Sequence, residues 1–129
     1  MLRINTRATN IDLTPAIEDY ILKRLEILEK FLKNTDQVLV DVEVGKINKH
    51  HKQGDVFRAE VHLRLPGEEF YATVEADDLY AAIDEVKDEI VREVSSKRKK
   101  ALRLLRKGGA RIKNMMRRAY DFLPRRKSK

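Results

Sequence analysis

Apolar side chains recur at two different spacings along this chain, and the changes in spacing divide it into six predicted elements. Residues 2–8 alternate apolar and polar positions, which is the period of a half-buried strand. The same alternation returns in three later segments: 38–45, 57–65 and 70–76. Two further segments repeat apolar residues every three or four positions, as an amphipathic helix does. The predicted order is strand, helix, three strands, helix.

The first predicted helix runs from Pro15 to Asn34. Thr14 is a suitable N-cap, and Pro15 fits the first helical position because its missing N–H is not needed there. The apolar stripe that should face the core is widened by Tyr20 and Phe31 and consists of Ile17, Ile21, Leu25, Leu28 and Leu32.

The second predicted helix spans residues 79–107, with Asp77 or Asp78 as its cap and Gly108-Gly109 as its stop signal. Its core-facing positions fall within one sector of the helix: Leu79, Ile83, Val86, Ile90, Val94, Ala101, Leu104 and Leu105. Such a helix is roughly 44 Å long, whereas an eight-residue strand spans roughly 26 Å. We therefore expect the helix to extend beyond the sheet.

Each predicted strand has one apolar face, so both helices should cover the same face of the sheet and leave the other face in water. The first two strands are joined by a helix and should be parallel, through a right-handed crossover. The turn at Pro66-Gly67-Glu68 should join the last two strands in an antiparallel meander. The fold class is α+β, with the order βαβββα, a four-stranded mixed sheet, and a long second helix that overhangs it.

Charge is sorted along the chain. Residues 1–96 have a formal balance of −7, and residues 97–129 have a balance of +14 with Asp121 as the single acid. On the face of the second helix opposite its apolar stripe, acids near its start give way to bases near its end: Lys99, Lys100, Arg103, Arg106 and Lys107. A basic block of this kind indicates an anionic partner, either nucleic acid or an anionic membrane.

The domain prediction is an α+β domain over residues 1–107 and a basic C-terminal tail over 108–129. Residues 110–123 of the tail have helical spacing of apolar side chains. Three interpretations of this segment stay open. It is a short helix folded back on the second helix, a segment that is disordered when free and orders in a groove of its binding partner, or a helix on an anionic membrane surface.

Several classes of protein are disfavoured by the sequence. Zero cysteines exclude disulfides and thiolate chemistry, and no apolar run approaches the ~20 residues that cross a bilayer. The N-terminus has no signal-peptide pattern, so we expect a cytoplasmic protein. His50-His51 lacks an evident third metal ligand, and no nucleophile or phosphate-loop motif is present. We expect no cofactor, no metal and no enzymatic activity.

Two segments resemble the ribosome hibernation-promoting factor family, also called ribosome-associated inhibitor or sigma-54 modulation protein, in its short form. They are LTPAIEDYI at residues 13–21 and DLYAAID at residues 78–84, and the resemblance covers about residues 1–107. It implies a factor that binds the small ribosomal subunit through ribosomal RNA. Such a factor occupies the messenger RNA and transfer RNA channel and silences translation under stress or in stationary phase.

The resemblance, together with the basic helix face, gives ten candidate RNA-binding residues whose role is to neutralise and position phosphates: Lys23, Arg24, Arg92, Lys97, Arg98, Lys99, Lys100, Arg103, Arg106 and Lys107. Lys30 matches a further basic position, whereas relatives often have bases where this chain has Glu89, Ser95 and Ser96. We expect no membrane partner, no small-molecule substrate, and a monomer off the ribosome. The alternative is a general RNA- or DNA-binding module without a fixed ribosomal site.

Overall fold

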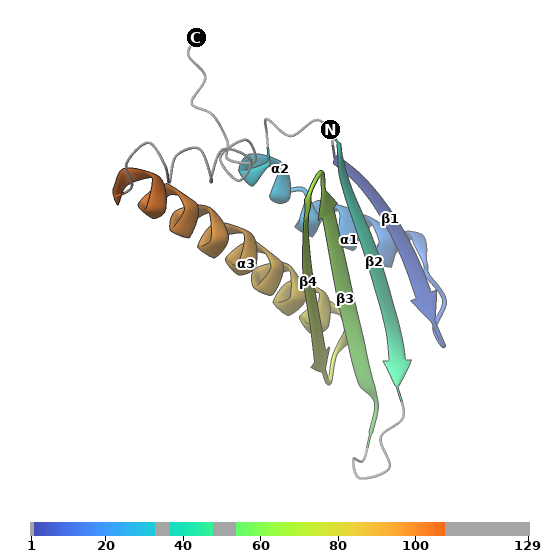
Figure 1. Cartoon of the computed structure of the whole chain (residues 1–129). Coiled ribbons are helices and arrows are strands. Elements are labelled where there is room, and N and C mark those ends of the chain that lie inside the picture. The colour runs from blue at the N-terminus through green and yellow to red at the C-terminus, as the bar shows by residue number, and fades with distance from the viewer. Residues whose placement is uncertain (1, 33–36, 48–53, 108–129) are drawn as a thin grey trace.

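The structure is a computed structural model that describes residues 2–32, 37–47 and 54–107. It consists of one sheet with helices on one of its faces (Figure 1). The elements are β1 (Leu2–Thr9), α1 (Pro15–Leu25), α2 (Leu28–Phe31), β2 (Val38–Ile47), β3 (Val56–Leu65), β4 (Glu68–Ala76) and α3 (Leu79–Lys107). The predicted helix end at Asn34, the His50-His51 loop, the stop at Gly108-Gly109 and the tail 108–129 lie outside the described residues.

The four strands lie in the order β1-β2-β3-β4. β1 and β2 are parallel, and the β2–β3 and β3–β4 pairs are antiparallel, which confirms the predicted mixed sheet. In this register Val40 lies opposite Leu63, which in turn lies opposite Phe70, so the apolar positions of neighbouring strands share one face. A slip of one residue would turn these side chains to the solvent, so burial fixes the register.

The core lies between the helices and the apolar face of the sheet. Its largest fully buried side chains come from every layer: Ile21, Leu25 and Leu28 from the first helical segment, Val40, Val44, Val61 and Leu63 from the sheet, and Ile83, Val86, Ile90 and Val94 from α3. Burying each such side chain contributes roughly 1.5–3 kcal/mol of transfer free energy. The opposite face of the sheet carries polar side chains, as the alternation predicts.

The predicted first helix is divided into α1 and α2. Hydrogen bonds tighten to the i→i+3 type at the break, where the Glu29 N–H donates to Glu26 O and the Lys30 N–H donates to Ile27 O, each at 3.1 Å. Leu25 and Leu28 are still both buried on either side of the break. The prediction of one continuous helix is therefore wrong, although its core-facing stripe is correct.

The predicted helix starts are confirmed. The hydroxyl of Thr14 accepts a hydrogen bond from the Ile17 N–H at 3.2 Å, and the Asp78 carboxylate accepts one from the Ala81 N–H at 2.9 Å. Asp78, rather than Asp77, is therefore the cap of α3. These bonds satisfy N–H groups that have no partner within the helix.

Gly45 marks a close approach between β1 and β2. A Cβ atom at this position would lie 2.7 Å from the carbonyl oxygen of Thr9, which is closer than a side chain can tolerate. The absence of a side chain thus lets the parallel pair run to the end of β1.

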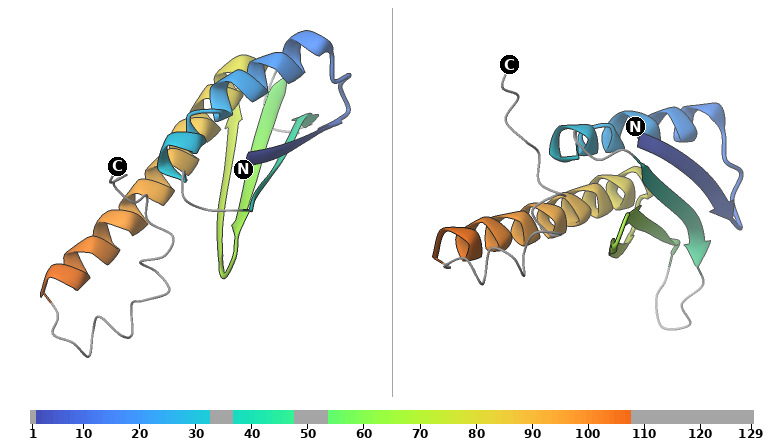
Figure 2. Two further views of the ribbon diagram at one scale, coloured as in Figure 1. Left: turned by 90° about the horizontal axis from the view of Figure 1, so that it is seen from above. Right: turned by 45° about the horizontal axis from the view of Figure 1, so that its top comes forward.

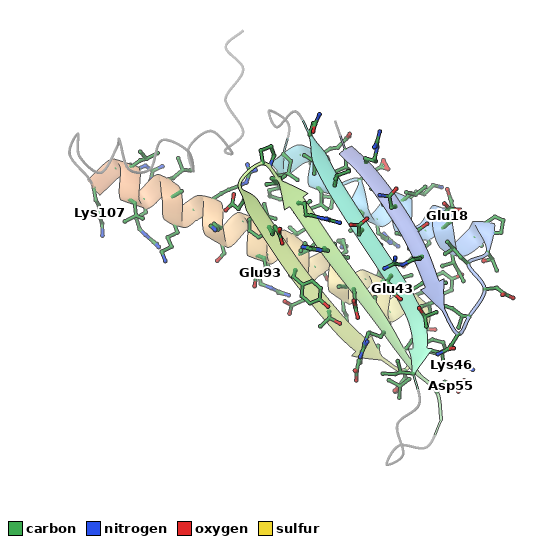
Figure 3. The ribbon with its side chains drawn as sticks, turned by 45° about the vertical axis from the view of Figure 1, so that its right-hand side comes forward. Glu18, Glu43, Lys46, Asp55, Glu93 and Lys107 are labelled. Carbon is green, nitrogen blue, oxygen red and sulfur yellow. The ribbon has the colours of Figure 1, made fainter. Side chains whose placement is uncertain are left out.

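The long helix α3 extends beyond the sheet, as predicted (Figures 1 and 2). Figure 3 shows Glu93 where α3 still lies beside β4, and Lys107 at the far tip of the helix. The stretch from residue 98 to residue 107 is about 15 Å long at 1.5 Å per residue. Among the described helices, none is long and apolar enough to cross a membrane.

Candidate nucleic-acid interface

The helices α1 and α3 run side by side in the same direction (Figure 2). The ring of Tyr20 on α1 contacts that of Tyr80 on α3, with centroids 4.8 Å apart. One turn later on both helices, Arg24 Nε lies 3.1 Å from Asp84 Oδ1. Both helices therefore direct their C-terminal ends, where cations are favourable, toward the same end of the molecule.

Arg24 is held in place by its neighbours on both helices. Its guanidinium lies 4.7 Å from the centroid of the Tyr20 ring. The Tyr20 hydroxyl donates to both carboxylate oxygens of Asp84 at 2.9 Å. Interaction with Tyr20, and then the charge of Asp84, raises the pKa of Arg24. This candidate is a positioned cation rather than a freely moving one.

The other cations of the first helical segment are more exposed. Lys23 Nζ lies 3.4 Å from Asp19, in a pair that is open to solvent on both sides. Lys23 and Lys30 also line a groove of about 620 Å³ whose apolar wall includes Leu2 and Leu32. Exposed pairs of this kind contribute little to stability, so Lys23 can exchange its carboxylate for another anion at low cost.

The candidates on the part of α3 that lies beside the sheet are also paired. Arg92 lies 3.8 Å from Glu89, one turn earlier on the same helix. Lys97 Nζ lies 2.8 Å from a carboxylate oxygen of Glu68 and 5.8 Å from the centroid of the Phe70 ring. Both contacts of Lys97 come from the start of β4, where α3 leaves the sheet.

The remaining surface candidates lie on the projecting end of α3. All five are exposed, and none makes an ion pair within the described part of the chain: Lys99, Lys100, Arg103, Arg106 and Lys107. Residues 97–107 contain no acid. We call these five residues the distal basic face. It is an array of positive charge on one helix end, and no acid of the described ranges pairs with it.

Arg98 differs from its neighbours because its side chain is buried, with 8% of the residue exposed. It lies on the apolar stripe between Val94 and Ala101, both of which are buried. Among the described residues, neither terminal nitrogen of its guanidinium has a hydrogen-bond partner. Burial lowers the pKa of Arg98 to about 10, although the charge of Glu68 opposes the change. In this conformation Arg98 is not presented to a surface ligand.

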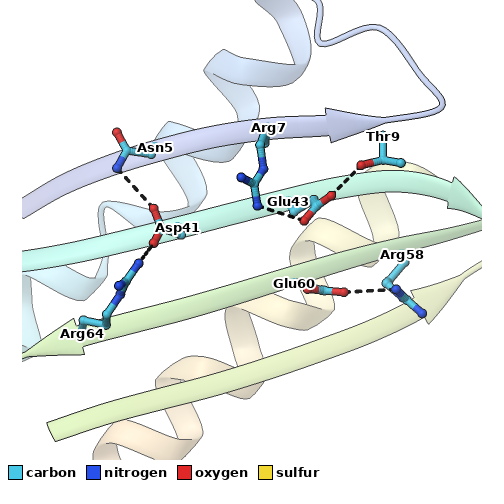
Figure 4. A network of polar contacts seen from close by, with 8 residues as sticks. All are labelled: Asn5, Arg7, Thr9, Asp41, Glu43, Arg58, Glu60 and Arg64. Carbon is cyan, nitrogen blue, oxygen red and sulfur yellow. Dashed lines mark hydrogen bonds and ion pairs between the residues drawn. The ribbon is translucent and has the colours of Figure 1, made fainter.

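The open face of the sheet carries a network of opposite charges that were not predicted as a site (Figure 4). Asp41 accepts hydrogen bonds from Arg64 and from Asn5, and Glu43 accepts them from Thr9 at 2.5 Å and Arg7 at 3.3 Å. Arg64 first and then Asn5 lower the pKa of Asp41, and Thr9 is the main cause of the lowered pKa of Glu43. Arg7, Arg58 and Arg64 on this face are thus each paired with a carboxylate of the sheet, whereas Arg3 makes no ion pair among the described residues.

The pairing of Glu68 with Lys97 was not predicted either, because Glu68 was expected only to form part of a turn. No group of metal-ligating side chains is present in the described ranges. The described residues therefore form two contrasting surfaces: a sheet face whose charges are mostly paired, and a helix end whose five cations form no ion pair. The second surface can bind a polyanion without first breaking ion pairs.

Comparison with known proteins is consistent with this arrangement. The family model described as "Sigma 54 modulation protein / S30EA ribosomal protein" matches residues 4–102. A ribosome hibernation promoting factor of Acinetobacter guillouiae is 32% identical over 103 residues, covering 78% of this chain and 91% of the relative. The corresponding factor of Klebsiella oxytoca is 28% identical over 99 residues, covering 77% and 96%.

Solved structures show the same fold. The N-terminal domain of Thermus thermophilus Protein Y matches with a TM-score of 0.59 at 30% identity, covering 69% of this chain and 90% of that one. A ribosomal subunit interface protein from Coxiella burnetii matches with a TM-score of 0.58 at 20% identity, covering 74% and 96%, and supports the fold alone.

Proposed function

The chain belongs to the family of sigma 54 modulation proteins and S30EA ribosomal proteins, and from that premise we propose that it is a ribosome hibernation factor. It binds the small ribosomal subunit through ribosomal RNA at the messenger RNA and transfer RNA channel. The folded body, residues 1–107, blocks that channel and silences translation under stress or in stationary phase. Its place of action is the cytoplasm, and it acts without catalysis.

The observation that carries this proposal is the distal basic face of α3. Ribosomal RNA is a dense lattice of phosphates, and each phosphate neutralised by a lysine or arginine releases condensed counterions. Double-helical RNA is recognised mainly through its shape and backbone, which a rigid projecting helix can match. This chain matches 91% and 96% of the lengths of the two relatives reported above, and both are named ribosome hibernation promoting factors. Their names support the ribosome as the source of those phosphates.

The ten candidate residues have different roles in this proposal. The five cations of the distal basic face supply the primary phosphate contacts. Lys23, Arg24 and Arg92 are paired with acids in the free protein, so they are secondary contacts that form when an RNA phosphate replaces the carboxylate. Lys97 is paired with the sheltered carboxylate of Glu68 and contacts RNA only where that pair opens. Arg98 contacts RNA only if its buried guanidinium becomes exposed.

Sedimentation of the full chain with small ribosomal subunits tests the proposal. The variant Lys99→Gln/Lys100→Gln/Arg103→Gln removes three distal charges, and Arg3→Gln/Arg7→Gln/Arg58→Gln removes three charges from the open sheet face. The loss of three phosphate contacts should weaken binding about 100-fold at roughly 0.1 M salt and reduce the slope of log K against log[salt] by about 2. The sheet variant should bind within about threefold of the wild type.

Displacement of messenger RNA is the second readout. Stoichiometric binding that survives near-physiological salt and excludes messenger RNA supports the hibernation factor. If binding is nonstoichiometric, is lost on addition of bulk RNA and leaves messenger RNA in place, the proposal is wrong and the chain is a general nucleic-acid binder.

A further inference from the structure

The carboxylate of Glu68 lies beside Lys97 of α3, at the point where the helix leaves the sheet. Glu68 is the first residue of β4 and follows Gly67, whose φ of 79° makes the tight turn from β3. The Glu68 side chain is only 13% exposed, and its carboxylate lies 2.8 Å from Nζ of Lys97. The turn therefore directs this acid toward the helix rather than toward the solvent.

Two cations face this one carboxylate. Lys97 is paired with Glu68 and also lies over the ring of Phe70. Arg98 is the next residue on the helix, and the charge of Glu68 acts to raise its pKa. The terminal nitrogens of Arg98 have no hydrogen-bond partner among the described residues. A carboxylate oxygen here occupies the position that a phosphate oxygen would take beside a lysine.

The pairing separates Lys97 from the distal basic face. The carboxylate of this pair is sheltered, whereas the Lys97 side chain is 58% exposed. A sheltered carboxylate is screened less by water and ions, so it holds a cation more strongly than an exposed acid does. A phosphate that approached Lys97 would also meet the negative charge of Glu68. An RNA strand therefore gains nothing at this point unless the internal pair opens first.

We propose that Glu68 is a specificity-determining residue that withholds Lys97 from flexible RNA and so lowers nonspecific binding. The inference rests on the proposed function and deepens it. A flexible strand can move a phosphate onto any available cation, whereas the phosphates of a folded ribosomal subunit are fixed in place. Removing the carboxylate should therefore strengthen binding to loose RNA more than binding to the subunit. Specificity is the difference between these two affinities.

The test compares Glu68→Gln with Glu69→Gln in the full chain. Both substitutions remove one negative charge from adjacent residues, but Glu69 lies on the open face of the sheet, where it pairs with His62. The ligands are single-stranded oligouridylate and purified small ribosomal subunits. For oligouridylate, Glu68→Gln should bind about fivefold more tightly at roughly 0.1 M salt, with a salt slope steeper by about 0.7, as one added phosphate contact requires. Glu69→Gln should match the wild type within twofold.

For the small subunit, Glu68→Gln should change affinity by less than about twofold. The role of Glu68 would be overturned if Glu68→Gln gained equal affinity for both ligands. It would also be overturned if the affinity of Glu68→Gln for oligouridylate rose no more than that of Glu69→Gln. Failure of the wild type to bind subunits and exclude messenger RNA would instead contradict the proposed function, whatever the variants do.

Two further variants separate the proposed role from a merely structural one. Glu68→Asp keeps the charge and should retain the wild-type affinity and salt slope. In a Lys97→Met background, Glu68→Gln should lose most of its gain on oligouridylate, because the cation that it releases is gone. A gain that persists in full without Lys97 would contradict the proposal. Urea unfolding of each variant verifies that the compared proteins are folded.

Discussion

Replacing Arg98 with methionine should make the protein more stable, although it removes a charge from the most basic segment of the chain. Arg98 occupies a buried position on the apolar stripe of α3, and methionine is an unbranched apolar side chain of similar reach. The terminal nitrogens of Arg98 have no hydrogen-bond partner among the described residues. Such a buried charge is costly, and an apolar residue of similar volume removes that cost.

The magnitude follows from the change in proton affinity. Burial lowers the pKa of Arg98 to about 10 in the folded chain, well below that of an unburied guanidinium. At 1.36 kcal/mol per pH unit this lowering corresponds to at most roughly 3–4 kcal/mol against the charged form. The substitution also removes the attraction of Glu68 and leaves some space unfilled, so we expect a net gain of about 1–2 kcal/mol.

The direction with pH follows from the lowered pKa. Above about pH 10 the folded chain begins to lose the Arg98 proton while the unfolded chain still binds it, so the wild type gains stability only as the pH rises above that pKa. At pH 7 the penalty is present in full. The advantage of Arg98→Met should therefore be the same at pH 7 and pH 9.

Urea unfolding followed by circular dichroism measures the effect. The control is Arg103→Met, which removes an exposed charge from the same helix and should change the free energy of unfolding by less than about 0.5 kcal/mol. A loss of stability in Arg98→Met, with Arg103→Met unchanged, would refute the reasoning, because it would mean that the guanidinium makes favourable contacts. In RNA binding the order should reverse, with Arg103→Met the weaker binder.

Three other changes test the rest of the structure. Ile90→Ala truncates a fully buried side chain of α3 and should cost about 2–5 kcal/mol of unfolding free energy in urea; a cost below about 1 kcal/mol would place α3 away from the core. Thr14→Ala removes the cap of α1 and should cost about 1 kcal/mol in the same assay, whereas Thr73→Ala, on the open sheet face, should cost less. Because Arg64 and Asn5 lower the pKa of Asp41, its stabilising contribution is present above about pH 3.9 and is lost as the pH falls through its folded-state value. The midpoint of thermal unfolding of Asp41→Asn should therefore fall less between pH 5 and pH 2 than that of the wild type. An equal fall in both proteins would contradict the stabilising role of the Asp41–Arg64 pair.

The sheet could be predicted from the sequence because each strand has one buried face. Alternation of apolar and polar residues in segments such as 57–65 predicts both a strand and the face of the strand that is buried. Because every strand has one apolar face, the helices are predicted to cover one face of the sheet. The break after Leu25 could not be predicted in the same way. Leu25, Leu28 and Leu32 face the core whether the helix is continuous or tightened, so the apolar pattern is the same for both.

The candidate site was less accessible from the sequence. The five cations of the distal basic face follow from a helical repeat and a run of bases, both of which are local. The spacing of Arg98 indicates a buried position, because it lies four residues after Val94 and three before Ala101, on the apolar stripe. Its place in a run of bases led instead to the prediction of a surface contact. The contact of Lys97 with Glu68 joins residues 29 positions apart and depends on how far α3 passes the turn. Such a distance is set by tertiary packing and not by any local pattern.

The arrangement of charge also explains how one end of the molecule can be chosen for RNA. Residues 1–96 have a net charge of −7, and the arginines of the open sheet face that Figure 4 shows are each paired with a carboxylate. In the proposed function, a phosphate lattice is repelled by the net charge of the body and attracted most strongly by the helix end, which would orient the protein before contact is made. Because the distal basic face lies on the end of α3 that extends beyond the sheet, binding RNA through it would leave the folded body outside the groove that the helix enters (Figure 1). In the proposed function, a body held in that position blocks the channel by its volume alone, so inhibition would need no movement of the protein and no chemistry.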